Sequence, residues 1–208
     1  MAEEDAAAAE LLAGCWLQWA ERCSSLTAGE WTTATRCSPW DVAALVAHVA
    51  PDPLVLAALP GAAMDGPAAI EDPSVLLAGF NQPGAVAHAM AAEVSGRATA
   101  LAAELGPEAL ADRFQEGAAI VTAEPLPLAT VLPHPVVGSV TAGVLAAVAI
   151  VEATVHHLDL IDAVGGEVPP ELALAFTRDV VVRVSEPAPL IEAMTGRRNP
   201  LTWFPLIH

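Results

Sequence analysis

Glu152 and His156 lie four residues apart in an apolar stretch that we expect to be helical. Side chains at this spacing project from one face of an α-helix, with Cβ atoms about 5 to 6 Å apart. A carboxylate oxygen and an imidazole nitrogen bind zinc at about 2.0 to 2.2 Å, and a catalytic site with three protein ligands keeps one position open. The pair therefore fits a metal site, although the same spacing is also typical of a solvated contact on a helix surface.

The neighbours of this pair favour the metal site. They are largely apolar: Val148, Ala149, Ile150, Val151, Val155, Leu158 and Leu160. A carboxylate buried among such residues requires a partner. Asp159 follows His156 by one helical turn and is placed to orient its imidazole through the other ring nitrogen. The alternative for Asp159 is a simple polar residue near a helix end.

His48 is the candidate third ligand, because it is the only histidine in the apolar segment 43–50. The alternative is a core histidine bonded to a backbone carbonyl. His88 has no neighbouring acid, and His134 lies between two prolines. His157 is displaced by about 100° around the helix from His156, so both cannot face one metal.

Three segments carry a resemblance to a known family. Residues 31–50, WTTATRCSPWDVAALVAHVA, resemble the first signature of the mycothiol-dependent maleylpyruvate isomerase family, in the DinB-like superfamily. Residues 151–160, VEATVHHLDL, resemble the second signature, and 194–197, MTGR, resemble the closing helix. The resemblance covers about residues 8–198 in the expected order.

This resemblance implies an antiparallel four-helix bundle with a long crossover connection. It also implies that a divalent metal, which we expect to be zinc, is bound by His48, Glu152 and His156, with Asp159 supporting them. Further residues are weaker candidates for substrate binding, each with packing or a surface role as the alternative: Trp40, Arg36, Arg113 and Arg197.

The implied activity is a metal-dependent isomerase or thiol transferase that uses mycothiol and acts on a small electrophile. A metal-bound thiol loses its proton at neutral pH, and the thiolate then attacks an electrophilic carbon. One alternative is a thiol-independent hydrolase, lyase or cyclase in small-molecule biosynthesis, with the metal as a Lewis acid. Another is a non-catalytic metal- or ligand-binding bundle. The isomerases of this family carry an extra C-terminal domain, which we expect to be absent here.

The elements that must position these residues are predicted to be helices in a single all-α domain, 1–208. Apolar residues recur at helical spacing, and Gly and Pro mark the boundaries. Ser38 is the expected cap of the second helix. Residues 57–73 are predicted to form a loop, and 124–135 an extended connection. The predicted helices are 2–26, 38–50, one from 74 or 83 to 105 that Gly106-Pro107 ends, 139–164, 171–185 and 187–196, followed by a tail at 197–208.

Composition narrows the partners. Eight arginines and no lysine face 25 acidic residues, which gives a net charge of -17. Such a charge repels phosphate backbones and disfavours multiply anionic substrates. We therefore expect no nucleic-acid partner, a neutral or apolar small-molecule substrate, and a monomer or homodimer.

Cysteine usage and hydropathy predict a reduced, cytoplasmic protein. Cys15 and Cys23 are separated by about 12 Å of helical rise, too far for a disulfide. The acidic start at Met1 does not resemble a signal peptide. The apolar run 136–151 is shorter than the roughly 20 residues of a membrane span, so we expect a buried core helix and no membrane partner.

Overall fold

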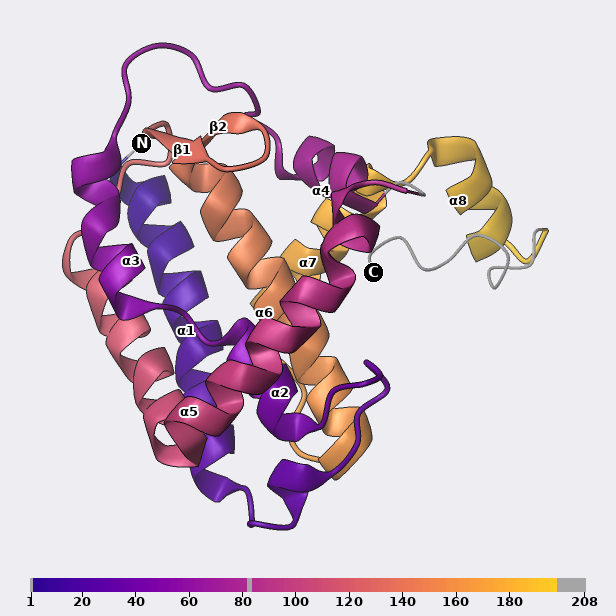
Figure 1. The fold of residues 1–208 in the computed structure, drawn as a ribbon. Helices are drawn as coiled ribbons and strands as arrows, with labels where there is room; N and C mark the ends of the chain where they lie inside the picture. Colours follow the sequence, from indigo (N-terminus) through magenta and orange to yellow (C-terminus); the bar gives the residue numbers. More distant parts are fainter. Residues whose placement is uncertain (1, 82–83, 198–208) are drawn as a thin grey trace.

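The computed structural model describes residues 2–81 and 84–197, and these fold mainly into helices (Figure 1). The expected all-α fold is confirmed, with one small hairpin at the edge. The helices are α1 (Ala2–Ser25), α2 (Val42–Val49), α3 (Pro53–Ala58), α4 (Pro73–Asn81), α5 (Val86–Ala123), α6 (Ala142–Val164), α7 (Glu171–Val184) and α8 (Pro187–Met194), with short 3-10 helices at Glu30–Thr32 and Leu59–Ala62.

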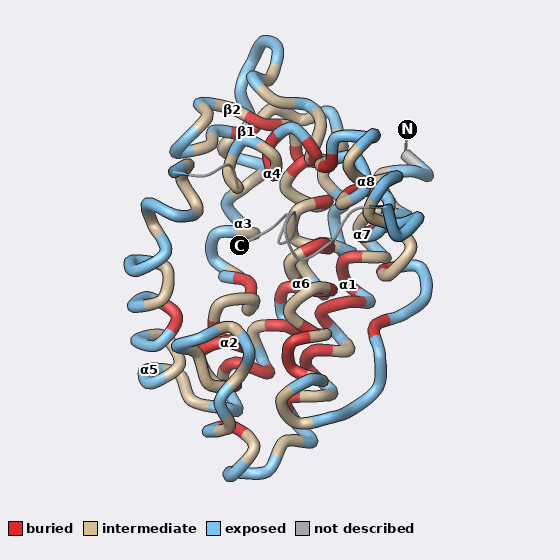
Figure 2. Tube along the Cα trace, turned by 90° about the vertical axis from the view of Figure 1, so that its right-hand side faces the viewer, coloured by how far each residue is buried: buried red, intermediate tan, exposed pale blue. Residues whose placement is uncertain are grey.

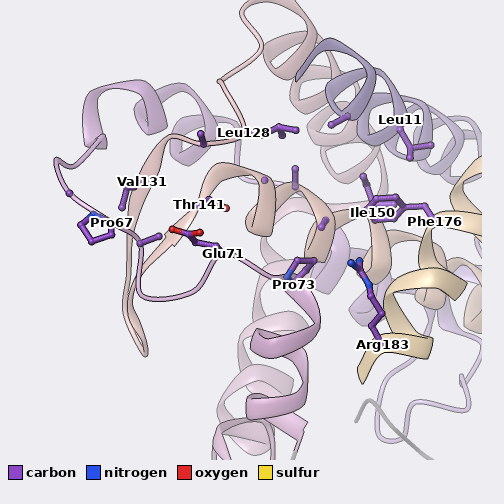
Figure 3. A pocket seen from close by; sticks show the side chains of 17 residues that line it. Leu11, Pro67, Glu71, Pro73, Leu128, Val131, Thr141, Ile150, Phe176 and Arg183 are labelled. Carbon is purple, nitrogen blue, oxygen red and sulfur yellow. The ribbon is translucent and has the colours of Figure 1, made fainter. Parts of the chain in front are cut away.

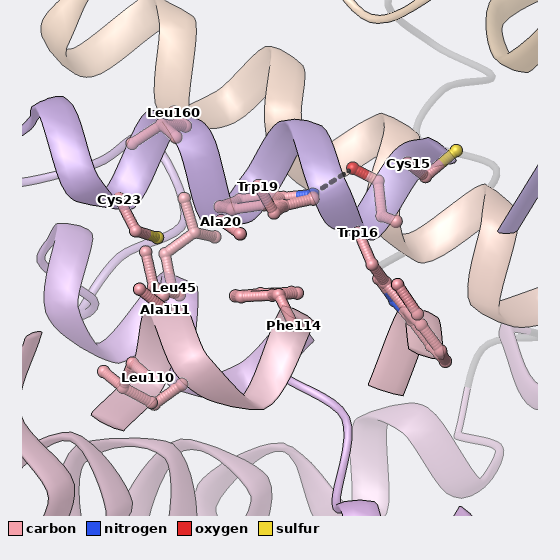
Figure 4. Close-up of a cluster of buried hydrophobic side chains, with 14 of the residues drawn as sticks. Cys15, Trp16, Trp19, Ala20, Cys23, Leu45, Leu110, Ala111, Phe114 and Leu160 are labelled. Carbon is pink, nitrogen blue, oxygen red and sulfur yellow. Dashed lines mark hydrogen bonds between the residues drawn. The ribbon is translucent and has the colours of Figure 1, made fainter. Parts of the chain in front are cut away.

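The hydrophobic core lies where α1, α2, α5 and α6 meet. Trp19 of α1 is fully buried and stacks on Phe114 of α5, with ring centroids 5.5 Å apart (Figure 4). Its indole N–H donates to the Ala153 carbonyl of α6 at 2.9 Å, so one side chain links three helices. Buried segments accordingly run along α1, α2 and α6 in Figure 2.

Helix α5 changes direction at Gly106, where φ is 72° and ψ is 176°. Glycine tolerates this positive φ, and Pro107 is compatible with the first turn of the following helical segment. The helix predicted to end here does so, but residues 107–123, to which no element was assigned, continue as a second helical half. In Figure 1 this half runs back along α1, which explains its apolar face of Leu110, Phe114 and Ala118.

Helix α2 begins three residues later than predicted, at Val42 and not at Pro39. Its N-cap is Asp41, whose carboxylate accepts a hydrogen bond from the Ala44 N–H at 2.9 Å, and not Ser38. The preceding residues are held in a loop instead, because the Val42 N–H donates to the Thr33 carbonyl at 2.9 Å. Residues 33–41 therefore leave the helix and fold over its start.

The hairpin was not predicted. Strands β1 (Val131–His134) and β2 (Gly138–Thr141) pair antiparallel, and the turn between them begins at Pro135. The expected extended connection 124–135 thus ends in a strand, and single bridges from Met64 and Ile70 tie the predicted loop to this hairpin. Helix α6 begins after the hairpin at Ala142, three residues later than predicted, with Thr141 as its N-cap.

By length and hydropathy, residues 42–62 and 142–164 are the two described stretches that reach the level of a membrane span. The second stretch is α6, which lies at the centre of the fold and contacts α1, α2, α4 and α7. Half of its apolar window is buried against these helices. Packing of a core helix is therefore sufficient to explain its hydropathy.

Candidate metal centre

The structure brings His48, Glu152 and His156 together from two helices. His48 lies in the last turn of α2, and the other two lie one turn apart on α6. The Glu152 Oε2 atom is 3.6 Å from His48 Nε2 and 3.3 Å from His156 Nε2. One donor atom from each residue lies within 4.8 Å of the other two, a spacing that suits three ligands of one cation.

Asp159 holds the far side of the His156 ring. Its Oδ2 atom is 2.8 Å from His156 Nδ1, while Oδ1 accepts a hydrogen bond from Arg36 Nε at 2.6 Å. The Cys37 thiol also donates to Oδ2, at 3.1 Å. With Nδ1 bonded to Asp159, His156 presents Nε2 to Glu152 and His48, as a proton donor in the metal-free chain or as a ligand of a bound cation. This is the arrangement in which a carboxylate orients a metal-binding histidine.

Cys37, His156 and Asp159 form a second group whose donor atoms lie within 4.8 Å of one another. The guanidinium of Arg36 already neutralises Asp159, which disfavours a second cation there. We therefore interpret this group as hydrogen-bonded support for His156.

The electrostatics of the centre suit a cation. Burial would raise the pKa of Glu152, but hydrogen bonds from His156 and His48 outweigh it and lower that pKa to about 2. For His156, burial acts to lower the pKa, but the hydrogen bond with Asp159 and its other partners hold that pKa well above the usual range. The centre thus keeps its carboxylates ionised and attracts positive charge, which a proton or a divalent metal ion supplies. The donor set of two imidazoles and one carboxylate fits zinc.

Two side chains of this network were not recognised as such from the sequence. Arg36 was considered only as a substrate-binding or surface residue, and Cys37 only as a free thiol. Both lie in the loop 33–41, which the Thr35 N–H closes by donating to the Trp40 carbonyl at 3.0 Å. The sequence feature that could have indicated their role is their position just before Trp40 in the first signature segment.

Trp40 lines the cavity and also packs against residues of α2 and α5. Its ring lies over His48, with centroids 4.6 Å apart, and its indole N–H donates to Ser95 Oγ of α5 at 3.1 Å. The side chain therefore restrains His48 and also lines the cavity described below.

Arg113 and Arg197, named as weak substrate-binding candidates, are not at this centre. The second half of α5 meets the cavity only from Ile120 onward, so the site of Arg113 lies outside it. Arg197 follows α8, is exposed, and donates to the Thr195 carbonyl nearby. The rest of the predicted tail, 198–208, lies outside the described residues.

The other histidines are placed elsewhere. His157 is buried against Trp19, with ring centroids 5.2 Å apart. His134 lies in β1, and its Nδ1 accepts hydrogen bonds from the backbone N–H groups of Val136 and Val137. His88 is an exposed residue of α5.

The centre lies in the wall of a cavity of about 2040 Å³. Metal donors, Trp40 and Arg36 line it together with apolar residues of α2 to α6. A second cavity of about 600 Å³ lies beside the start of α6, where Glu71 and Arg183 are the charged lining residues (Figure 3). In the described part of the chain no histidine or cysteine lines this second cavity. The larger cavity is therefore the one lined by candidate metal ligands.

The family model described as the mycothiol maleylpyruvate isomerase N-terminal domain matches residues 12–161. This range contains both signature segments and all residues of the centre. No curated protein and no solved structure matches the chain.

Proposed function

Because the chain belongs to the mycothiol maleylpyruvate isomerase N-terminal domain family, we propose that it is a divalent-metal-dependent isomerase or thiol transferase. Its metal, which we propose to be zinc, is held by His48, Glu152 and His156. The observation that carries the proposal is the convergence of these three donors within 4.8 Å at the wall of a large cavity.

A divalent metal at this centre supplies a Lewis acid that lowers the pKa of a bound thiol or polarises a substrate oxygen. Residues of the chain hold the metal ligands in position. Asp159 keeps a proton on His156 Nδ1 so that Nε2 is available as a ligand, and Arg36 keeps Asp159 ionised. Trp40 packs against the ring of His48 and lines the same cavity.

The first test is the metal content of the purified protein and of the variants His48→Ala and Glu152→Ala, measured by elemental analysis. We expect about one metal per chain in the wild type and loss of most of it in both variants. His88→Ala is the matched control, because His88 also lines the cavity but lies on α5 and is not one of the three converging donors. Full metal retention in both ligand variants would refute the site.

The second test separates the thiol-dependent reaction from its alternatives. In cobalt-substituted protein, we expect the visible spectrum to change when mycothiol is added, because a thiolate ligand alters the metal environment. An unchanged spectrum would favour a thiol-independent metal enzyme acting on small molecules. Retention of the metal without conversion of any electrophile tested would favour a non-catalytic binding protein.

A further inference from the structure

The large cavity extends from the metal donors along one face of α6. The helical positions that line it recur every three or four residues and end at Asp159. They are Ala142, Leu145, Ala146, Val148, Ala149, Glu152, Val155, His156 and Asp159. From Ala142 to Asp159 the helix rises by about 25 Å. The cavity is therefore elongated, with the metal donors toward one end.

The wall beyond the donors is apolar. Leu76, Leu77 and Phe80 line it from α4, and Met90 and Val94 line it from α5. Leu76 and Leu77 are each only 4% exposed, so the wall is part of the packed structure. The volume of about 2040 Å³ exceeds the roughly 300–1,000 Å³ that is usual for small-molecule pockets. This space admits a ligand much longer than a compact organic acid.

The cavity offers little to a charged group far from the donors. Arg36 is the only arginine among its described lining residues, and its guanidinium is engaged by Asp159 at 2.6 Å. Asp5, Asp52 and Glu124 also line it, and all three are acidic; the first two accept hydrogen bonds from the backbone N–H groups of Leu128 and Leu54. Two further histidines line it, His88 on α5 and His134 on β1, and burial lowers the pKa of His134. An anion placed in the apolar part would lose hydration without gaining a cation.

We propose that the substrate is an elongated, largely aliphatic molecule with one polar group at the metal donors and no charge along the rest of its length. This inference rests on the proposed function, since the metal centre defines the polar end. The α6 face and the α4 wall then bury the aliphatic part.

The test is calorimetric titration of the purified, metal-analysed protein with 1-hexanol, 1-octanol and 1-decanol. Burial of aliphatic carbon contributes about 0.8 kcal/mol per methylene, so we expect affinity to rise about three- to fourfold for each added carbon. Decanedioate, a dianion with ten carbons, must place one carboxylate in the apolar part in either orientation. We expect it to bind at least tenfold more weakly than 1-decanol. No gain with chain length, or tighter binding of decanedioate, would overturn the inference.

The variant Leu145→Trp tests where the chain lies. Leu145 precedes Glu152 by about 10 Å of helical rise, so an indole there shortens the cavity but leaves the donors free. We expect 1-hexanol to bind as before and the gain toward 1-decanol to disappear. Leu172→Trp, an exposed position on α7, is the matched control and should keep the full series.

Measuring the metal content distinguishes failure of the substrate assignment from failure of the proposed enzyme function. If Leu145→Trp retains both metal and the complete chain-length series, the substrate assignment is wrong while the metal centre stands. If the wild type binds no metal but shows the series, the proposed enzyme function is wrong while the elongated ligand site stands. The wild-type series is decisive even if the variant does not fold.

Discussion

His156 and His157 are adjacent in the sequence, but they lie about 100° apart around α6 and in contrasting environments. His156 faces the cavity, where Asp159 and Glu152 hold its pKa well above the usual range. His157 faces α1, where burial and then the charge of Arg22 lower its pKa to about 4. The protonation of each imidazole is therefore set by what packs opposite to it, since the local sequence is the same for both.

The cysteines show the same contrast between these two regions. Burial raises the pKa of Cys15 to about 11 and that of Cys23 to about 12, on the α1 side. Cys37 instead lines the cavity and donates to Asp159. One side of α6 is thus a dry core, and the other is a polar centre that opens into a cavity.

Truncation of a buried side chain in the core beside α1 should have the largest effect on stability. Trp19→Ala deletes a fully buried ring that stacks on Phe114 and bonds to Ala153. We expect a loss of about 3–5 kcal/mol in the free energy of unfolding, measured by urea denaturation. Leu17→Ala, at a position 52% exposed on the same helix, is the control and should change it by less than about 1 kcal/mol. A small effect of Trp19→Ala would show that α1 does not anchor this face.

The adjacent histidines should give the metal-free protein opposite pH dependences. Below about pH 6.5 the unfolded chain protonates His157, whereas the folded chain does so only near pH 4, so stability falls on acidification by about 3 kcal/mol. Above pH 6.5 the folded chain still holds the His156 proton that the unfolded chain has lost, so stability falls as the pH rises. Urea denaturation across pH 4–9 should show a maximum near pH 6.5.

Two substitutions test which histidine causes the loss of stability on each side of the maximum. His157→Gln should remove most of the fall in stability between pH 6.5 and about pH 5; at lower pH Glu152, whose folded-state pKa is lowered to about 2, adds to the fall. His156→Gln should flatten the fall in stability on the alkaline side. His88→Gln, at an exposed position of α5, is the control for the removal of an imidazole elsewhere in the chain. An unchanged fall between pH 6.5 and about pH 5 in His157→Gln would mean that another group, such as His134, whose pKa is also lowered by burial, titrates there.

Asp159→Asn tests the support of the metal centre. The amide cannot hold the Nδ1 proton of His156 as a carboxylate does, so we expect metal affinity to fall about 10- to 100-fold in a competition titration with a chelator. Asp162→Asn is the matched control, because this exposed carboxylate is 3.9 Å from Arg36 but is not bonded to His156. Equal effects of both variants would indicate a general charge effect and no specific support.

Cys37→Ala should have the smallest effect. It removes one hydrogen bond to Asp159, while Arg36 and His156 remain bonded. We expect a loss of about 1 kcal/mol in unfolding free energy, and recovery in Cys37→Ser, whose hydroxyl also donates. Complete loss of metal in Cys37→Ala would instead make the thiol a ligand and change our interpretation of the centre.

The sequence by itself determined several of the helical elements and half of the centre. Helical periodicity is a local property, so the extents of α1 and α7 and the shared face of Glu152 and His156 follow from residues close together in the chain. The signature segment around Trp40 selected His48 by resemblance, since spacing cannot link residues on different helices.

Only the tertiary structure decided the rest. The bond between Arg36 and Asp159 joins residues 123 positions apart, and no local pattern encodes such a contact. The second half of α5 lacks a strong sequence signal, yet it forms a helix because its apolar face packs on α1. In the same way, packing decided that His156 faces ligands and His157 faces Trp19. Long-range contacts thus converted a one-residue difference in sequence into two different chemical environments.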